Sequence, residues 1–308
     1  MCQAHYAPMT ARALPTPSAV AELFKPITWF PPMWAFACGA VASGVSTDGR
    51  LPLLLAGVLL AGPLVCATSQ AVNDWFDREV DAINEPHRPI PSGRMPGHWG
   101  LYLALAWTAL SLAWAGALGP VTFVAALFGL ALAWAYSAPP LRLKRNGWWG
   151  NAACGLCYEG LAWVTGAAVM AGGMPSTGSL LLALLYSLGA HGIMTLNDYK
   201  AIDGDRRMGI RSLPVQLGPV GAAWTASATM AVPQAVVIGL LLAWGQPLHA
   251  AAVALLLAVQ LLMMRRFIAA PKERALWLSG LGVPLYVTGM MVSALALRAV
   301  TQAAQGGA

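Results

Sequence analysis

Nine long apolar runs constrain the fold of this chain more than any other feature. They lie at about residues 27–46, 51–72, 99–118, 120–136, 148–172, 179–196, 218–244, 248–264 and 276–297. A helix needs roughly 20 apolar residues to cross the hydrocarbon core of a bilayer. Because 58% of the residues are hydrophobic and only 10% are charged, an ordinary soluble domain is excluded. The sequence predicts an all-α polytopic membrane protein with about nine transmembrane helices around a central cavity.

The segments between these runs predict which way the protein faces. With the N-terminus in the cytoplasm, the loops at about 73–98, 137–147, 197–217 and 265–275 share its side of the membrane. Of the 18 Lys and Arg residues, 16 fall on that side, and only Arg50 and Arg298 do not. Since Lys and Arg near helix ends fix orientation, the basic charge reflects topology, and we expect no nucleic-acid partner.

The same topology divides the chain into three parts. We expect residues 1–26 to form a cytoplasmic N-terminal tail, residues 27–298 the membrane domain and residues 299–308 a C-terminal tail. The first 26 residues lack the apolar core and small-residue cleavage site of a secretory signal peptide.

Carboxylates are concentrated in two short segments, which together hold eight of the 12 Asp and Glu residues. Each segment follows an even-numbered run, and the two open alike, with Asn73-Asp74-Trp75 and Asn197-Asp198-Tyr199. The offset of 124 residues spans about four runs. We therefore expect two four-helix parallel repeats followed by a ninth helix, with the acidic segments facing each other across the cavity.

The spacing of the acids predicts a metal site. Asp74, Asp77 and Asp81 lie at positions i, i+3 and i+7, which share one face if the second span continues as a helix. Asp198 and Asp205 also share a face if their segment is helical. Hard oxygen ligands suit Mg²⁺, which commonly bridges carboxylates to substrate phosphates. The alternative, a solvated acidic helix face, is disfavoured because charge is costly at a membrane boundary and the pattern occurs twice.

Cations flank both acidic segments. They are Arg88, Arg94, Arg142, Lys144, Lys200, Arg206 and Arg211. Carboxylates that hold Mg²⁺ and cations that hold the remaining oxygens together suit a metal-bridged diphosphate. Topology or contact with lipid headgroups explains any one of these cations alone, but it does not explain their coincidence with the acids.

Several stretches resemble a known family. The pattern Asn73-Asp74-x-x-Asp77-x-x-x-Asp81 resembles the first aspartate-rich motif of the UbiA superfamily of intramembrane prenyltransferases, and residues 197–205 resemble the second. The segments 73–94, 136–148 and 197–218 are similar to the chlorophyll and bacteriochlorophyll synthase branch. In many relatives, the first aspartate of the second motif is followed three residues later by another aspartate. This chain has Ala201 at that position, and the Lys-Ala variant is itself typical of that branch.

The resemblance implies an activity and a place in the cell. It implies Mg²⁺-dependent transfer of a geranylgeranyl or phytyl group from its diphosphate to the propionate carboxylate of chlorophyllide or bacteriochlorophyllide. The implied location is a bacterial cytoplasmic or intracytoplasmic photosynthetic membrane, with the active site facing the cytoplasm.

The expected site residues fall into three groups. The catalytic group is Asp74, Asp77, Lys144 and Asp198, and the Mg²⁺ ligands are Asp74, Asp77, Asp81, Asp198 and Asp205. The group expected to contact the diphosphate is Asn73, Arg88, Arg94, Tyr136, Arg142, Lys144, Asn197, Lys200, Arg206 and Arg211.

Other interpretations stay open at this point. A prenyltransferase for a quinone precursor or haem would use the same chemistry, and a transporter or pigment-binding scaffold would belong to a different class. A transporter is expected to place its charged site near the bilayer midplane, whereas these acids follow the cytoplasmic ends of spans. Glu159 has either a structural or an acceptor-site role. His191 is either a hydrogen-bonded core histidine or a ligand of a tetrapyrrole magnesium.

Overall fold

The computed structural model describes residues 14–306, and every regular element in that range is helical. The α-helices are α1 (Pro17–Phe24), α2 (Phe30–Ala42), α3 (Leu51–Leu59), α4 (Ala67–Asn84), α5 (Trp99–Leu118), α6 (Pro120–Ser137), α7 (Gly147–Gly155), α8 (Ala162–Ala171), α9 (Thr177–Asp198), α10 (Ile202–Arg207), α11 (Leu213–Ala243), α12 (Pro247–Ala269) and α13 (Pro271–Gly306). Short 3₁₀ and π-helical segments join some of them. The 3₁₀ segments are η1 (Pro26–Thr28), η3 (Leu143–Arg145) and η5 (Tyr199–Ala201), and the π-helical segments are η2 (Leu60–Cys66) and η4 (Leu156–Leu161).

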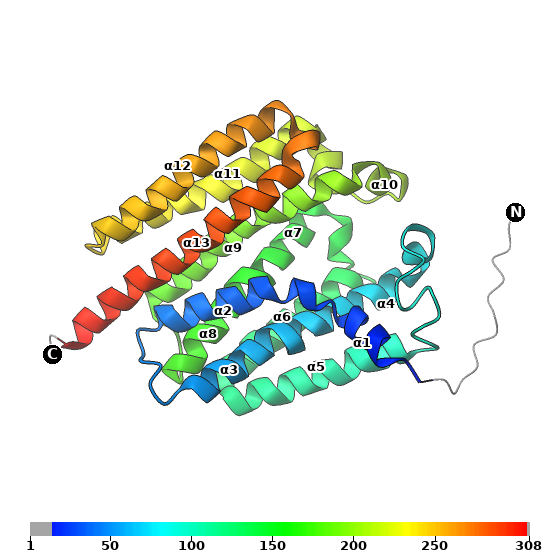
Figure 1. Cartoon of the computed structure of the whole chain (residues 1–308), viewed down its shortest axis with the longest axis horizontal. Coiled ribbons are helices and arrows are strands. Elements are labelled where there is room, and N and C mark those ends of the chain that lie inside the picture. Colours follow the sequence, from blue (N-terminus) through cyan, green and yellow to red (C-terminus); the bar gives the residue numbers. More distant parts are fainter. Residues whose placement is uncertain (1–13, 307–308) are drawn as a thin grey trace, which may run out of the picture.

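The helices confirm a multi-pass membrane protein. Eight helical stretches in the described range are long and apolar enough to cross a bilayer: Leu51–Asn84, Trp99–Leu118, Pro120–Ser137, Gly147–Ala171, Thr177–Arg207, Leu213–Ala243, Pro247–Ala269 and Pro271–Ala304. The ninth apolar helix, Phe30–Ala42, is shorter than the predicted run at 27–46. Figure 1 shows these helices side by side along the long axis of the molecule. The relation between two four-helix repeats stays a prediction.

Glycines allow α2 and α8 to pack closely. A Cβ atom on Gly39 would overlap the carbonyl oxygen of Trp163, and one on Gly166 would overlap the carbonyl oxygen of Phe36. Transmembrane helices associate through such small-residue contacts because lipid tails compete for larger apolar side chains. This contact packs α2, the first of the apolar helices, against α8 in the middle of the chain.

Two wide, π-helical turns interrupt long spans. The segment η2 separates α3 from α4 and contains Pro63, which has no backbone N–H to donate. The segment η4 separates α7 from α8. Wide turns of this kind are frequent at functional sites, and both contribute side chains to one mostly apolar cavity.

The ends of the chain differ from simple tails. Thr16 caps α1, since its Oγ1 accepts from the backbone N–H of Ala19 at 3.3 Å, and Pro17 suits the first helical turn. Ala19 and Leu23 are fully buried, so the second half of the predicted tail is a packed helix. Residues 1–13 lie outside the described part. At the other end, α13 continues through the predicted C-terminal tail to Gly306.

Candidate active site

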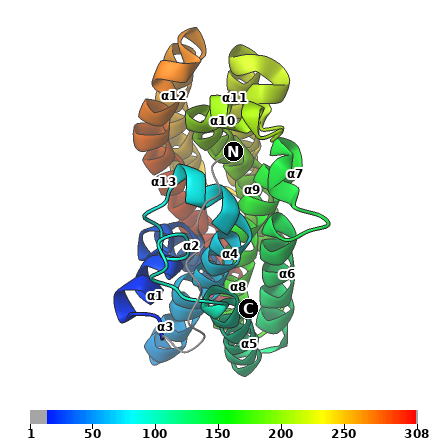
Figure 2. The same cartoon turned by 90° about the vertical axis from the view of Figure 1, so that its right-hand side faces the viewer.

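The first acidic motif lies on the last turns of α4. The helix continues without interruption to Asn84, as the sequence predicted, and carries Asp74, Asp77 and Asp81. Asp74 is only 2% exposed and Asp81 only 6%. Figures 1 and 2 place this end of α4 at the same end of the molecule as α1 and α10. Buried carboxylates need counter-charges, and those come from three separate segments.

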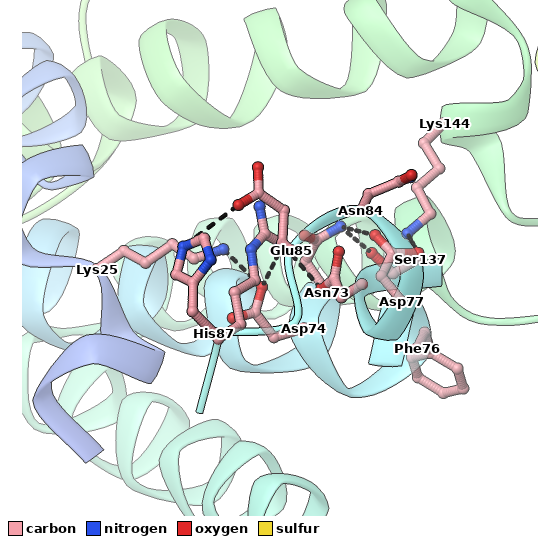
Figure 3. Close-up of polar contacts among 12 residues, drawn as sticks. Lys25, Asn73, Asp74, Phe76, Asp77, Asn84, Glu85, His87, Ser137 and Lys144 are labelled. Atoms are coloured by element: carbon pink, nitrogen blue, oxygen red, sulfur yellow. Dashed lines mark hydrogen bonds and ion pairs between the residues drawn. The ribbon is translucent and has the colours of Figure 1, made fainter. Parts of the chain in front are cut away.

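Each carboxylate of the first motif has a cation. Lys25 Nζ lies 2.5 Å from Asp74 Oδ1, and Lys144 Nζ lies 2.5 Å from Asp77 Oδ1. Arg88 donates to Asp81 Oδ2 at 2.8 Å and is 3.5 Å from Asp74 Oδ1. Figure 3 shows Lys25 and Lys144 reaching α4 from opposite sides. The motif is therefore an alternation of acids and bases, an arrangement that suits a metal-bridged anion.

The environment tunes two of these cations differently. Burial lowers the pKa of Lys144, and the neighbouring Asp77 carboxylate opposes that shift. Burial also acts to lower the pKa of Arg88, but Asp74 and Asp81 outweigh it, so the pKa of Arg88 is raised. The two carboxylates thus favour the charged form of Arg88, and Asp77 favours the charged form of Lys144 against the effect of burial.

The basic loop between α6 and α7 joins the two acidic motifs. Arg142 donates to the carbonyl oxygen of Phe76 at 3.0 Å and lies 3.8 Å from Asp77 Oδ1. Further along the loop, the backbone N–H of Gly147 donates to the carbonyl oxygen of Arg211 at 2.8 Å, and the N–H of Arg211 donates to that of Arg145 at 2.9 Å. One loop thus contacts α4 on one side and the segment after α10 on the other.

The second acidic motif is less regular than the first. Asp198 ends α9, the turn η5 follows, and α10 begins at Ile202, so Asp198 and Asp205 do not lie on one continuous α-helix. That Asp198 and Asp205 share one face stays a prediction. Asn151 of α7 donates to Asp198 Oδ2 at 3.1 Å. Lys200 and Arg206 are exposed and form no ion pair with any carboxylate in the described part of the chain.

Arg94 pairs with a different acid. Its guanidinium donates to both carboxylate oxygens of Glu22, at 2.6 and 3.0 Å. The hydrogen bond from Arg94 lowers the pKa of Glu22 below its usual range. In this structure Arg94 ties its loop to α1, and its contact with a diphosphate stays a prediction.

A mostly apolar cavity of about 250 Å³ begins beside the first motif. Asn73, Gln70 and Tyr136 line it together with apolar residues of η2, α6, η4 and α8. Asn73 Nδ2 also donates to Asp77 Oδ2 at 3.0 Å and to Ser137 Oγ at 3.3 Å. Ala125 and Tyr136, which both line the cavity, are separated by roughly 16 Å along α6. An elongated apolar group in this cavity would have its polar end at the acidic motif.

Comparison with known proteins decides the family. The UbiA prenyltransferase family matches residues 28–297, which is most of the chain. The chain belongs to the UbiA prenyltransferase family. It is therefore an integral-membrane prenyltransferase, and the predicted resemblance is confirmed.

Individual members of the family agree with this assignment. The chain is 57% identical over 287 residues to the bacteriochlorophyll synthase 33 kDa chain of Cereibacter sphaeroides, covering 93% of this chain and 95% of that protein. It is 39% identical over 285 residues to the chloroplastic chlorophyll synthase of Arabidopsis thaliana, covering 89% and 73%. A solved UbiA homolog from Archaeoglobus fulgidus bound to GPP and Mg²⁺ has a TM-score of 0.70 at 19% identity, covering 89% and 99%, and confirms the fold.

The residues of this UbiA site fit Mg²⁺ by donor chemistry. The available donors are carboxylate oxygens, the ligands that Mg²⁺ prefers. Asp74 Oδ2 is buried and has no hydrogen-bond partner among the described residues. Within residues 14–306, however, no three Asp, Glu, His or Cys side chains are grouped closely enough to hold a metal together. The five carboxylates predicted as ligands are thus of the right kind but are distributed over two motifs.

Two residues of the site, Lys25 and Asn151, belong to no motif in the sequence. Lys25 is one of the expected cytoplasmic charges of the N-terminal tail, and it stands just before the first predicted span. An amide such as that of Asn151 within an apolar run is itself a signal, because buried polar groups in spans need partners.

The sequence leaves open the roles of two residues within predicted spans, Glu159 and His191. Glu159 is 5% exposed, its Oε2 has no partner in the described part, and it does not line the cavity beside the first motif. The His191 ring lies 5.7 Å from that of Trp148.

Proposed function

We propose that this protein is a bacteriochlorophyll synthase, which transfers a geranylgeranyl or phytyl group from its diphosphate to the propionate carboxylate of bacteriochlorophyllide. The observation that carries the proposal is the 57% identity to a bacteriochlorophyll synthase chain over nearly the full length of both proteins. The lower identity of 39% to a chlorophyll synthase favours the bacterial pigment as acceptor. This is the closing esterification of the pigment's biosynthesis.

The isoprenoid tail occupies the cavity that begins at Asn73. Its walls are largely apolar, and its length along α6 suits an extended chain. Burial of such a chain supplies binding free energy of about 25 cal/mol per Å² of apolar surface removed from water. Asn73 and Tyr136 then mark the position of the reacting carbon, next to the acidic motif.

The diphosphate lies among the cations of the cytoplasmic loops. Lys144 and Arg88 already sit at the first motif, and Arg142 lies 3.8 Å from Asp77. The remaining contacts proposed from the sequence are those of Arg94, Asn197, Lys200, Arg206 and Arg211. Asp74, Asp77, Asp81, Asp198 and Asp205 hold Mg²⁺, which neutralises charge on the diphosphate and so makes it a better leaving group.

The reaction itself needs little acid–base chemistry from the protein. The C–O bond between the allylic carbon and the diphosphate breaks, and the propionate oxygen forms the new C–O bond. Because a carboxylic acid with a pKa of about 4 is ionised at neutral pH, no general base is required. The protein positions the carboxylate, and the apolar cavity excludes water from the developing allylic cation.

The orientation follows from the positions of the cations. The loops that carry the site also carry most of the Lys and Arg residues, which favours a site that faces the cytoplasm. We place the protein in the cytoplasmic or intracytoplasmic photosynthetic membrane of a bacterium, where both hydrophobic substrates reach it from the bilayer.

Acceptor-dependent release of diphosphate tests this function. The purified protein in vesicles, with Mg²⁺ and geranylgeranyl diphosphate, should release diphosphate when bacteriochlorophyllide is added. Homogentisate-like or 4-hydroxybenzoate-like acceptors should not support release. Turnover with one of these aromatic acceptors and not with the chlorophyllides would indicate a quinone-type synthase. No release with any acceptor would favour a transporter or pigment scaffold.

A further inference from the structure

Lys25 is held in an unusual position by the backbone around it. It ends α1 in the left-handed region, with φ 47° and ψ 67°, which residues other than glycine seldom adopt. Its carbonyl oxygen accepts from Thr28 Oγ1 at 2.8 Å and from the Thr28 N–H at 2.9 Å. The tight turn points the chain from α1 toward α2 and sends the lysine side chain to the first acidic motif (Figure 3).

The helix that presents Lys25 is docked independently of this lysine. Leu23 is fully buried, and the Phe24 ring lies 4.5 Å from that of Trp107 on α5. Glu22 holds Arg94 of the loop after α4 through two hydrogen bonds. Apolar packing and one peripheral ion pair thus already fix α1, so the Lys25 ammonium is free to serve a second purpose.

The partner of Lys25 is the most buried acid of the motif. Asp74 Oδ1 is 2.5 Å from Lys25 Nζ and 3.5 Å from Arg88. Arg88 is engaged at shorter distance by Asp81, whereas Lys25 pairs with no other carboxylate in the described residues. Asp74 Oδ2 meanwhile has no partner there. Lys25 is therefore the cation dedicated to Asp74, on a long and flexible side chain.

We propose that Lys25 belongs to the diphosphate-binding site. Its ammonium balances Asp74 before the substrate binds, and it moves to a diphosphate oxygen when Asp74 takes up Mg²⁺. The N-terminal helix α1, which presents Lys25, is then part of the active site. This inference rests on the proposed prenyl-diphosphate chemistry but not on the identity of the acceptor.

The alternative is that Lys25 only attaches α1 to α4. A purely structural ion pair would keep the same environment with and without ligand. Lysine labelling separates the two, because the chain has only four lysines, Lys25, Lys144, Lys200 and Lys272. Lys272 lies at the start of α13, away from both motifs in sequence, and serves as an internal reference.

The full-length protein in detergent is acetylated briefly with an N-hydroxysuccinimide ester, and the four sites are quantified by mass spectrometry. Mg²⁺ alone should increase labelling of Lys25, and Mg²⁺ with inorganic pyrophosphate should reduce it again, with Lys272 constant throughout. Labelling of Lys25 that stays unchanged at saturating pyrophosphate, with binding verified by calorimetry, would overturn the proposal.

Variants give a second readout. Lys25→Gln should weaken Mg²⁺-dependent pyrophosphate binding about tenfold or more, the usual effect of losing one hydrogen bond to a charged group, whereas Lys25→Arg should retain most of it. Lys272→Gln is the matched control. Wild-type affinity in Lys25→Gln would contradict the proposal, and if that variant does not fold, the labelling of the wild-type protein decides. Pyrophosphate binding is independent of the acceptor. The binding experiment can therefore support the role of Lys25 even if the protein esterifies no pigment.

Discussion

Asn151 of α7 donates a hydrogen bond to Asp198 of α9 at 3.1 Å, and the same amide nitrogen lies 3.2 Å from Thr195 Oγ1. Asn151 is 5% exposed, so this bond forms inside the protein. No other side chain in residues 14–306 donates to the Asp198 carboxylate. The Asp198 carboxylate therefore accepts its side-chain hydrogen bond from a residue two helices earlier in the chain.

Removing this donor should weaken the second motif. We expect Asn151→Leu to lower Mg²⁺ affinity and kcat/KM by about 10- to 100-fold, since residues that orient metal ligands typically contribute this much. Titration of activity with Mg²⁺ gives both values. Asn84→Ala, at the exposed end of α4, should behave as the wild type. Unchanged Mg²⁺ dependence in Asn151→Leu would show that Asp198 is oriented by other means.

We expect Lys144 to affect the use of the prenyl diphosphate donor more than the use of the acceptor. Lys144→Gln removes the cation 2.5 Å from Asp77, and we expect kcat/KM for the prenyl diphosphate to fall about 10- to 100-fold, the range for a lost hydrogen bond to a charged group. Steady-state kinetics with each substrate varied in turn would separate the two effects. If only the KM for the acceptor changed, Lys144 would belong to the acceptor site.

A larger side chain in the cavity wall should change the preferred tail length. Ala126→Phe fills the part of the cavity remote from Asn73, so C20 diphosphates should lose about 10- to 200-fold in kcat/KM while a C10 diphosphate loses much less. Leu127→Phe on the lipid-facing side of the same helix is the control. Equal loss for C10 and C20 donors would mean that the tail lies elsewhere.

The contact between α2 and α8 should be sensitive to a single methyl group. Gly39→Ala forces a Cβ into the carbonyl of Trp163, and overpacking of this kind costs about 1–3 kcal/mol. A thermal melt in detergent should show a lower transition temperature. Gly280→Ala, where no atom lies within 4 Å of the added Cβ, is the matched control and should melt like the wild type. Identical melting of both variants would mean that the helices separate easily.

Hydrophobic length alone predicted most of the fold. Each of the nine runs corresponds to a helix, because a span must satisfy its backbone hydrogen bonds internally. The two π-helical turns and the packed helix α1 were not predicted. Their cause is tertiary: η2 and η4 face the cavity, and α1 is stabilised by burial of Leu23 against other helices.

The sequence predicted the part of the site that lies on one helix, but not the contacts between residues that are far apart in the chain. The spacing of Asp74, Asp77 and Asp81 needed only the continuation of one helix, and α4 provides it. The second motif is less regular because the 3₁₀ turn η5 interrupts the α-helix after Asp198. Lys25 and Asn151 reach their partners from 49 and 47 residues away, so only the fold brings them together.

Mass spectrometry of the pigment product tests the central claim most directly. The purified protein is incubated with Mg²⁺, both C20 diphosphates, and bacteriochlorophyllide or chlorophyllide, beside an Asp74→Asn and an Asp198→Asn variant. We predict that the wild type forms esterified bacteriochlorophyllide carrying one C20 chain. Either variant should form at least about a hundredfold less of this product, which is the usual effect of removing one group that stabilises developing charge. Absence of any esterified pigment from the folded wild-type protein would contradict the account.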